Sequence, residues 1–299
     1  MLVQSVVVAI FQDGNKILLA QRKKNTFMSG FWELSGGKVE EGEKKVDALI
    51  REIKEELGVE ILESQFFTKF TQQYKDRKIN LFFYKIKKYQ GIPEGLEGQE
   101  IKWVIKDEVD NFKLLPTMNK LLKILNLPDT LWITPEEITL IEIKQKLKQG
   151  IKLVQLRSKK TFTKKEIQQI YELCQKYQAK LMLNTQNMDF SLDCVDGFHL
   201  NTKLLFELKK IPSDKLISTV AHNKIELEKA YKLEADFCFI SPVLATSSHQ
   251  TTKPLGWDGA KKLFEISKLP VYFLGGLSNK ELSKAKEIGA IGIAGISLL

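Results

Sequence analysis

Glu52, Glu55 and Glu56 are the residues whose types and spacing most clearly indicate chemistry in this 299-residue chain. They lie in the run GKVEEGEKKVDALIREIKEELGV (37–59), which is rich in helix formers and reaches Gly58, a typical C-cap residue. At about 3.6 residues per turn, positions i, i+3 and i+4 share one face of a helix. Carboxylates crowded on one face repel each other, and a hard divalent cation such as Mg²⁺ would offset that repulsion by taking their oxygens as ligands.

The same run predicts which side of the helix is buried. Val46, Ile50, Ile53 and Leu57 recur at helical spacing and predict an apolar stripe that packs against a sheet. For three glutamates alone, the ordinary interpretation is a solvated acidic face.

The complete run decides between these interpretations, because it fills every fixed position of the pattern GX5EX7REUXEEXGU, where U is apolar. It is identified as the signature of the Nudix hydrolases. The stretches LLAQR, WELSGGKVEEGE, DRKINLFFY, GLEGQEIKW and PTMNKLL extend the resemblance to the MutT branch, which hydrolyses oxidised guanine nucleoside triphosphates. This resemblance implies an α/β/α sandwich with a mixed sheet over residues 1–128.

The resemblance also implies roles for individual residues. The ligands of Mg²⁺, which Mn²⁺ could replace, would be the carbonyl of Gly37 and the side chains of Glu52, Glu55, Glu56 and Glu97. The catalytic group would be Glu52, Glu55 and Glu97, with either Glu52 or Glu97 taking the proton of the attacking water. The substrate would be bound by Arg22, Phe27, Glu33, Leu34, Ser35, Gly36, Arg77 and Asn119. Phe27 stands where the archetype of the family has a histidine.

Several of these residues have simpler explanations when each is considered alone. Glu97 lies among other acids and would ordinarily be surface charge. Asn119 would satisfy backbone groups at the start of a helix, and Arg22 would be a cation at a strand end. Their positions relative to the signature support the functional interpretation.

The second half of the chain alternates short apolar runs with amphipathic stretches. Eight such runs occur, and eight β-α units favour a closed parallel (β/α)8 barrel over an open sheet. The runs are 131–134, 151–157, 180–184, 197–200, 216–222, 237–243, 270–276 and 291–297. We therefore expect an α/β chain with two domains, at 1–128 and 131–299.

The motifs VQLRSK, GFHL, VAHN, SPVLATSS and LGGLSNKEL in this half resemble thiamine-phosphate synthase and its thiazole tautomerase relative. This resemblance implies that Gln155, Arg157 and Asn184 face a phosphorylated pyrimidine or thiazole ligand, and that Thr246, Gly276 and Ser297 lie near phosphate. The synthase has two acids that bind Mg²⁺, where this chain has Thr185 and the segment 201–203. We therefore expect a degenerate barrel, which leaves ligand binding, a tautomerase-like reaction or a scaffold role open. His199 and His222 are expected to be structural.

Composition limits the classes of partner and compartment. The formal charge is +9, of which residues 130–299 contribute 25 Lys+Arg against 18 Asp+Glu, or +7. Basic clusters with interleaved aromatics are lacking, so an anionic small molecule is favoured over nucleic acid. Three cysteines without metal-ligand spacing, the lack of a signal peptide pattern and the lack of a membrane-length apolar run indicate a cytoplasmic protein with no membrane partner.

Two hypotheses for the first domain follow. In the leading one it removes 8-oxo-dGTP, or a related purine nucleoside triphosphate, from the nucleotide pool, which protects DNA replication from mutation. In the alternative, its substrate is a diphosphate of the thiamine pathway and the barrel delivers or senses it. The barrel could also be purely a binding or dimerisation module.

Overall fold

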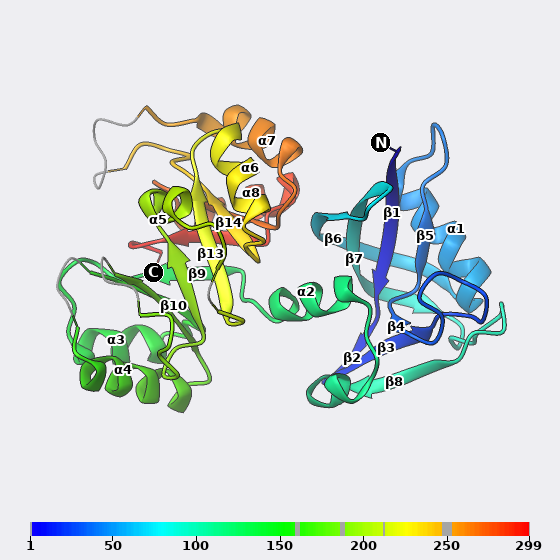
Figure 1. Ribbon diagram of the computed structural model, residues 1–299, viewed down its shortest axis with the longest axis horizontal. Helices are drawn as coiled ribbons and strands as arrows, with labels where there is room; N and C mark the ends of the chain where they lie inside the picture. The colour runs from blue at the N-terminus through cyan, green and yellow to red at the C-terminus, as the bar shows by residue number, and fades with distance from the viewer. Residues whose placement is uncertain (1, 159–161, 186–188, 212, 247–252, 299) are drawn as a thin grey trace. The chain divides into compact units, whose positions relative to one another are not determined.

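A computed structural model of the chain describes residues 2–158, 162–185, 189–211, 213–246 and 253–298. It divides the chain into two compact units, Met1–Leu125 and Asn126–Leu299. Figure 1 shows the two units, with labels on most of their helices and strands. No helix within the described ranges combines the length and the apolar character needed to cross a bilayer.

The first unit contains two sheets. One is mixed and has the order β5-β1-β7-β6, formed by β5 (Gly36–Lys38), β1 (Leu2–Ile10), β7 (Arg77–Gln90) and β6 (Glu60–Gln73). In it β1 is parallel to β7 and antiparallel to β5. The other contains β2 (Gln12–Asp13), β3 (Lys16–Gln21) and β4 (Trp32–Glu33), with β8 (Ile101–Ile105) also pairing with β3. Together with the helices, they form the predicted α/β/α sandwich.

Helix α1 (Lys45–Leu57) lies alongside β5 and β1 (Figure 1) and carries the signature. It ends at Gly58, whose positive φ of 69° suits glycine. Its buried residues are Ala48, Leu49, Ile53 and Leu57, which join the core formed by β1, β6 and β7. A 3-10 turn (Lys106–Asn111) and helix α2 (Pro116–Leu125) complete the unit.

The prediction of the buried stripe was wrong at two of its four positions. Val46 and Ile50 are 44% and 38% exposed, whereas Leu49 is fully buried. Leu49, Ile53 and Leu57 follow each other at intervals of four, and the small Ala48 beside them lets the sheet approach closely. This rotation places Val46 and Ile50 at the margin of the contact.

The second unit is a closed parallel barrel with strand order β10-β11-β12-β13-β14-β15-β16-β9, which confirms the predicted fold. Its strands are β9 (Thr130–Ile133), β10 (Leu153–Ser158), β11 (Lys180–Thr185), β12 (Gly197–Leu200), β13 (Leu216–Ala221), β14 (Phe237–Ile240), β15 (Val271–Leu274) and β16 (Gly292–Gly295). Each of the eight strands overlaps one apolar run of the sequence, with bounds that differ by at most three residues, because an all-parallel barrel buries both faces of every strand.

Helices cover the outside of the barrel. They are α3 (Leu140–Lys148), α4 (Lys164–Lys176), α5 (Thr202–Glu207), α6 (Lys224–Lys232), α7 (Gly256–Ile266) and α8 (Leu282–Ile288), the last preceded by a 3-10 turn (Asn279–Glu281). Thr139 and Thr163 begin α3 and α4 with reciprocal capping boxes. The large aromatic side chains of Phe237, Phe239 and Tyr272 are buried and pack against one another in the barrel interior.

Candidate functional site

A cavity of about 440 Å³ opens in the first unit beside the signature helix. Most of the residues predicted to bind substrate or metal line it. They are Arg22, Phe27, Glu33, Leu34, Ser35, Gly36, Gly37, Glu56, Arg77 and Glu97. Glu52, Glu55 and Asn119 are not among the residues that line it, so the cavity brings together a part of the predicted set.

The backbone of Gly36 and Gly37 forms one wall because β5 pairs with β1 there. Gly36 lies opposite Val8, and a Cβ on Gly36 would lie 2.1 Å from the carbonyl oxygen of Val7. A Cβ on Gly37 would lie 1.9 Å from Oε2 of Glu52. Position 36 therefore requires glycine, because backbone would have to shift, whereas a side chain at 37 would displace the Glu52 carboxylate from the space that it occupies.

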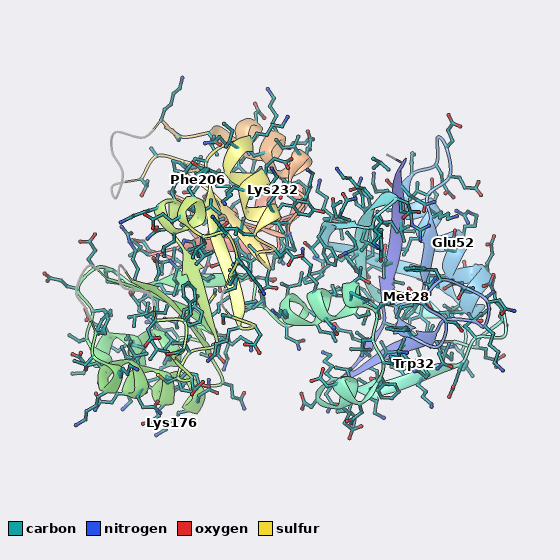
Figure 2. The ribbon with its side chains drawn as sticks, viewed as in Figure 1. Met28, Trp32, Glu52, Lys176, Phe206 and Lys232 are labelled. Atoms are coloured by element: carbon teal, nitrogen blue, oxygen red, sulfur yellow. The ribbon has the colours of Figure 1, made fainter. Side chains whose placement is uncertain are left out.

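Glu52 and Glu56 are one turn apart on α1 and both face this glycine pair; Figure 2 labels Glu52. The backbone N–H of Gly36 donates to Oε2 of Glu56 at 3.1 Å. Burial, together with the nearby charges of Glu33, Glu97 and Glu52, raises the pKa of Glu56 to about 7. Negative charge is therefore concentrated at this wall, where a bound cation would lower its electrostatic cost.

Arg51 is the cation that holds several of these acids in the structure. Its Nη1 donates to Oε1 of Glu52 at 2.8 Å, and its Nε and Nη2 each donate to Glu43 at 2.9 Å. Its Nη1 also lies 3.9 Å from Glu55, whose side chain is 60% exposed. These bonds lower the pKa of Glu43. Glu43, Arg51 and Glu52 of the signature therefore form one hydrogen-bonded group.

The predicted ligand set is not assembled into a cluster. Within the described ranges, no group of three or more His, Cys, Asp or Glu side chains is arranged to hold a metal ion. The side chain of Glu55 is largely exposed, and Glu97 pairs with Lys23 at 2.7 Å. The wall nevertheless fits a hard divalent cation, because the carboxylates of Glu52 and Glu56 and the backbone carbonyl of Gly37 are oxygen ligands.

Cationic and aromatic side chains form the opposite part of the cavity. Arg22 forms an ion pair with Glu33 and donates from Nε to the carbonyl oxygen of Phe27 at 2.7 Å. The guanidinium of Arg77 lies 5.6 Å from the ring centroids of both Phe27 and Tyr74, and these rings meet edge to face. The cavity therefore offers two arginines for phosphate and an aromatic surface for a planar group.

Among the lining residues that were not predicted, three contribute to the argument. Tyr74 contributes to the aromatic surface, and Thr117 of α2 lines the cavity where Asn119 was expected. Asn119 is exposed. Gln99 accepts from the N–H of Glu97 and donates to the carbonyl oxygen of Glu56, so it ties the loop of Glu97 to α1. Tyr74 could have been predicted from the sequence, because it lies three residues before Arg77 at the end of a hairpin.

The barrel contains a larger cavity, of about 770 Å³, around the carboxyl ends of its strands. All six residues predicted for a barrel ligand line it, namely Gln155, Arg157, Asn184, Thr246, Gly276 and Ser297. Gly276 has a φ of 65°, and a Cβ there would lie 2.3 Å from the carbonyl oxygen of Ala245. Glycine at 276 therefore lets the loop after β15 pass close to the loop after β14.

Both histidines discussed above also line this cavity. His199 is buried, its Nδ1 lies 2.8 Å from Oγ of Ser218, and its ring stacks on Phe239. Burial and the charge of Arg157 lower the pKa of His199 to about 3, so its ring is neutral at physiological pH. Nδ1 of His222 lies 2.6 Å from the carbonyl oxygen of Ser241. Because a carbonyl only accepts, Nδ1 of His222 carries the proton.

Comparisons with known proteins match the two units separately. Residues 1–125 match the family model described as NUDIX domain, and residues 131–299 match the one described as thiamine monophosphate synthase.

Individual relatives agree with this division. The CTP pyrophosphohydrolase of Escherichia coli is 35% identical over 37% of this chain and 82% of that protein. The 8-oxo-dGTP diphosphatase of Buchnera aphidicola subsp. Schizaphis graminum is 35% identical over 36% of this chain and 82% of that protein. The thiamine-phosphate synthase of Fusobacterium nucleatum is 31% identical over 52% of this chain and 78% of that protein.

Proposed function

The chain belongs to the Nudix hydrolases through residues 1–125 and to the thiamine monophosphate synthase family through residues 131–299, and from this premise we propose that its first unit is a pyrophosphohydrolase of oxidised purine nucleoside triphosphates. The substrate would be 8-oxo-dGTP or a close relative, and the products its monophosphate and pyrophosphate. We further propose that the domains comprise residues 1–128 and 131–299 and that the barrel is degenerate.

The observation that carries the proposal is the cavity wall at Gly36 and Gly37. Two carboxylates from successive turns of α1 converge on backbone that has no side chain, and two arginines lie in the same cavity. Glu52, Glu56 and the carbonyl of Gly37 would hold Mg²⁺ or Mn²⁺, with Glu55 and Glu97 as further ligands. When bound, the cation neutralises the phosphate chain and acidifies a water molecule.

Individual side chains would accept the proton, hold the phosphate and support the base. Glu52, or Glu97 in its place, would accept a proton from the water that attacks the β-phosphorus. The bond from the β-phosphorus to the oxygen bridging the α-phosphorus breaks, which releases pyrophosphate and leaves the monophosphate. Arg22 would hold phosphate, and Arg77 with Phe27 would support the base. Asn119 would meet the purine edge only if α2 or its side chain shifted, because Asn119 lies outside the cavity lining.

The aromatic surface supports a planar base but does not select a purine. A relative with 35% identity is named for CTP, so a pyrimidine nucleotide is the second candidate substrate. A thiamine-pathway diphosphate remains the alternative suggested by the barrel.

The test is pyrophosphate or phosphate release by the full chain from 8-oxo-dGTP, dGTP, CTP and thiamine diphosphate. We expect fastest turnover of 8-oxo-dGTP with Mg²⁺ and none with EDTA. Glu56→Gln should lower turnover on the order of 10²-fold or more, since several kcal/mol of charge stabilisation depend on it. Glu63→Gln, at an exposed position of β6, is the matched control. Faster turnover of CTP or thiamine diphosphate would replace the substrate, and full activity of Glu56→Gln would refute the site.

A further inference from the structure

The described lining of the barrel cavity carries no acidic side chain. Among the described residues that line it, none is Asp or Glu. The segments 159–161, 186–188 and 247–252, which lie outside the described residues, contain no Asp or Glu in the sequence either. The cavity is therefore polar without offering a carboxylate to a ligand.

The Mg²⁺ that the synthase family implies does not fit this cavity. A divalent cation of that kind is held in proteins by carboxylates together with substrate phosphates. Asn201, at the position following the His-Leu pair, already accepts the N–H of Leu204 at 3.0 Å as the cap of α5. The neutral amides and hydroxyls that remain supply no charge to offset a divalent ion.

The charges present suit a single phosphate better than a diphosphate. Arg157 is the one Arg or Lys among the described residues that line the cavity, and its side chain is 28% exposed. Glu136 lies 3.7 Å from Nη2 of Arg157 and offsets part of its charge. A phosphate monoester carries a charge of about −1.5 to −2 near neutral pH. A diphosphate carries more, so the single cationic side chain of the described lining would match a smaller part of its charge.

Gln155 gives an independent indication of a ligand. It is 2% exposed and lines the cavity, and its Oε1 has no hydrogen-bond partner in the part of the chain that the structure describes. A buried acceptor without a donor destabilises the fold, so such atoms are rare in native proteins. A ligand that carries an O–H or N–H group would supply the missing donor.

We propose that the barrel cavity binds a small phosphate monoester without a divalent cation. Arg157 meets the phosphate, and Oε1 of Gln155 accepts a hydrogen bond from a hydroxyl or amino group of the same molecule. The cavity volume of about 770 Å³ is that of a small-molecule site. Phosphate sites near the last strands are common in this fold, and Gly276 and Ser297 lie there. The barrel is then a metal-free ligand site, whatever the first unit hydrolyses.

Ligand-observed ³¹P NMR on the full chain carrying Glu56→Gln tests the proposal, because the substitution removes a ligand of the proposed cation and so weakens cation-dependent phosphate binding in the first unit. The probes are glycerol 3-phosphate, inorganic phosphate and pyrophosphate, each with EDTA or with Mg²⁺. We expect glycerol 3-phosphate to bind equally in both conditions. Arg157→Gln should weaken this binding by about tenfold or more, the effect of losing a charge-assisted hydrogen bond.

Two further variants separate recognition from folding. Lys176→Gln removes a cation at the exposed last turn of α4 (Figure 2) and should leave binding unchanged. Gln155→Leu replaces a buried amide whose Oε1 is unpaired with an apolar side chain of similar size, and should abolish the preference for glycerol 3-phosphate over inorganic phosphate. Circular dichroism verifies that each variant is folded.

Three results would overturn the proposal. One is binding of glycerol 3-phosphate that requires Mg²⁺, or its failure to bind at all. Another is affinity that is unchanged in folded Arg157→Gln. The third is pyrophosphate binding that Mg²⁺ strengthens and Arg157→Gln abolishes, because that result would restore a metal-held diphosphate site.

Discussion

The buried imidazole of His199 should make the stability of the barrel depend on pH. Its pKa is lowered from 6.5 to about 3, first by burial and then by the charge of Arg157. The unfolded chain takes up the proton near the higher value, so proton uptake favours unfolding as the pH falls below about 6.5. The free energy of unfolding continues to fall down to about pH 3. The total decrease is about 5 kcal/mol, of which about 2 kcal/mol is lost by about pH 5.

The substitution His199→Gln removes the titrating group and should remove this dependence. We expect the drop in free energy of unfolding between about pH 7 and about pH 5 to be smaller by about 2 kcal/mol in the variant, whatever its absolute stability. Urea unfolding followed by hydrogen exchange mass spectrometry of peptides from β12 and β14 reports on the barrel alone. His222→Gln, which removes an exposed imidazole from the same cavity, is the matched control. An equal drop in wild type and His199→Gln would refute the reasoning.

Further expected outcomes concern the hydrolase and the thiols. Gly37→Ala should lower pyrophosphate release on the order of 10²-fold with little change in Tm, since its Cβ would displace the Glu52 carboxylate; wild-type turnover would contradict this. Glu52→Gln should cost more activity than Glu97→Gln, because Glu97 is exposed and paired with Lys23; the reverse order in kcat would assign the base to Glu97. Burial raises the pKa of Cys174 and Cys238 to about 12, so both should resist a maleimide in the folded chain and react in urea; rapid native labelling would show that they are accessible.

The local pattern of residues was enough to predict much of the fold. The signature run became α1 with Gly58 as its C-cap, and the eight apolar runs became the eight barrel strands. Both predictions rest on short-range properties, namely helix propensity, capping and burial on both faces of a strand. The positions of residues within the motifs likewise predicted many of the side chains that line each cavity, including all six in the barrel.

Tertiary packing decided what these patterns could not. Helix α1 buries Leu49 rather than Val46 and Ile50, because the fit of Ala48 and Leu49 against the sheet sets its rotation. The partners of the carboxylates could not be predicted from the sequence either. Glu52 joins Arg51 and the glycine wall, Glu55 is largely exposed, and Glu97 meets Lys23 across a long separation in sequence.

The sequence by itself determined the types of residue available to each site, and therefore the kind of chemistry each could support. At the two positions where the synthase has acids this chain has Thr185 and the segment 201–203, so no carboxylate is available at either position to hold a divalent cation. Only the folded structure decided that Gln155 lies buried with an unpaired oxygen and that His199 is held neutral. Burial and pairing arise from contacts between distant segments. The order of residues in the chain does not specify the local dielectric or the neighbours of each side chain.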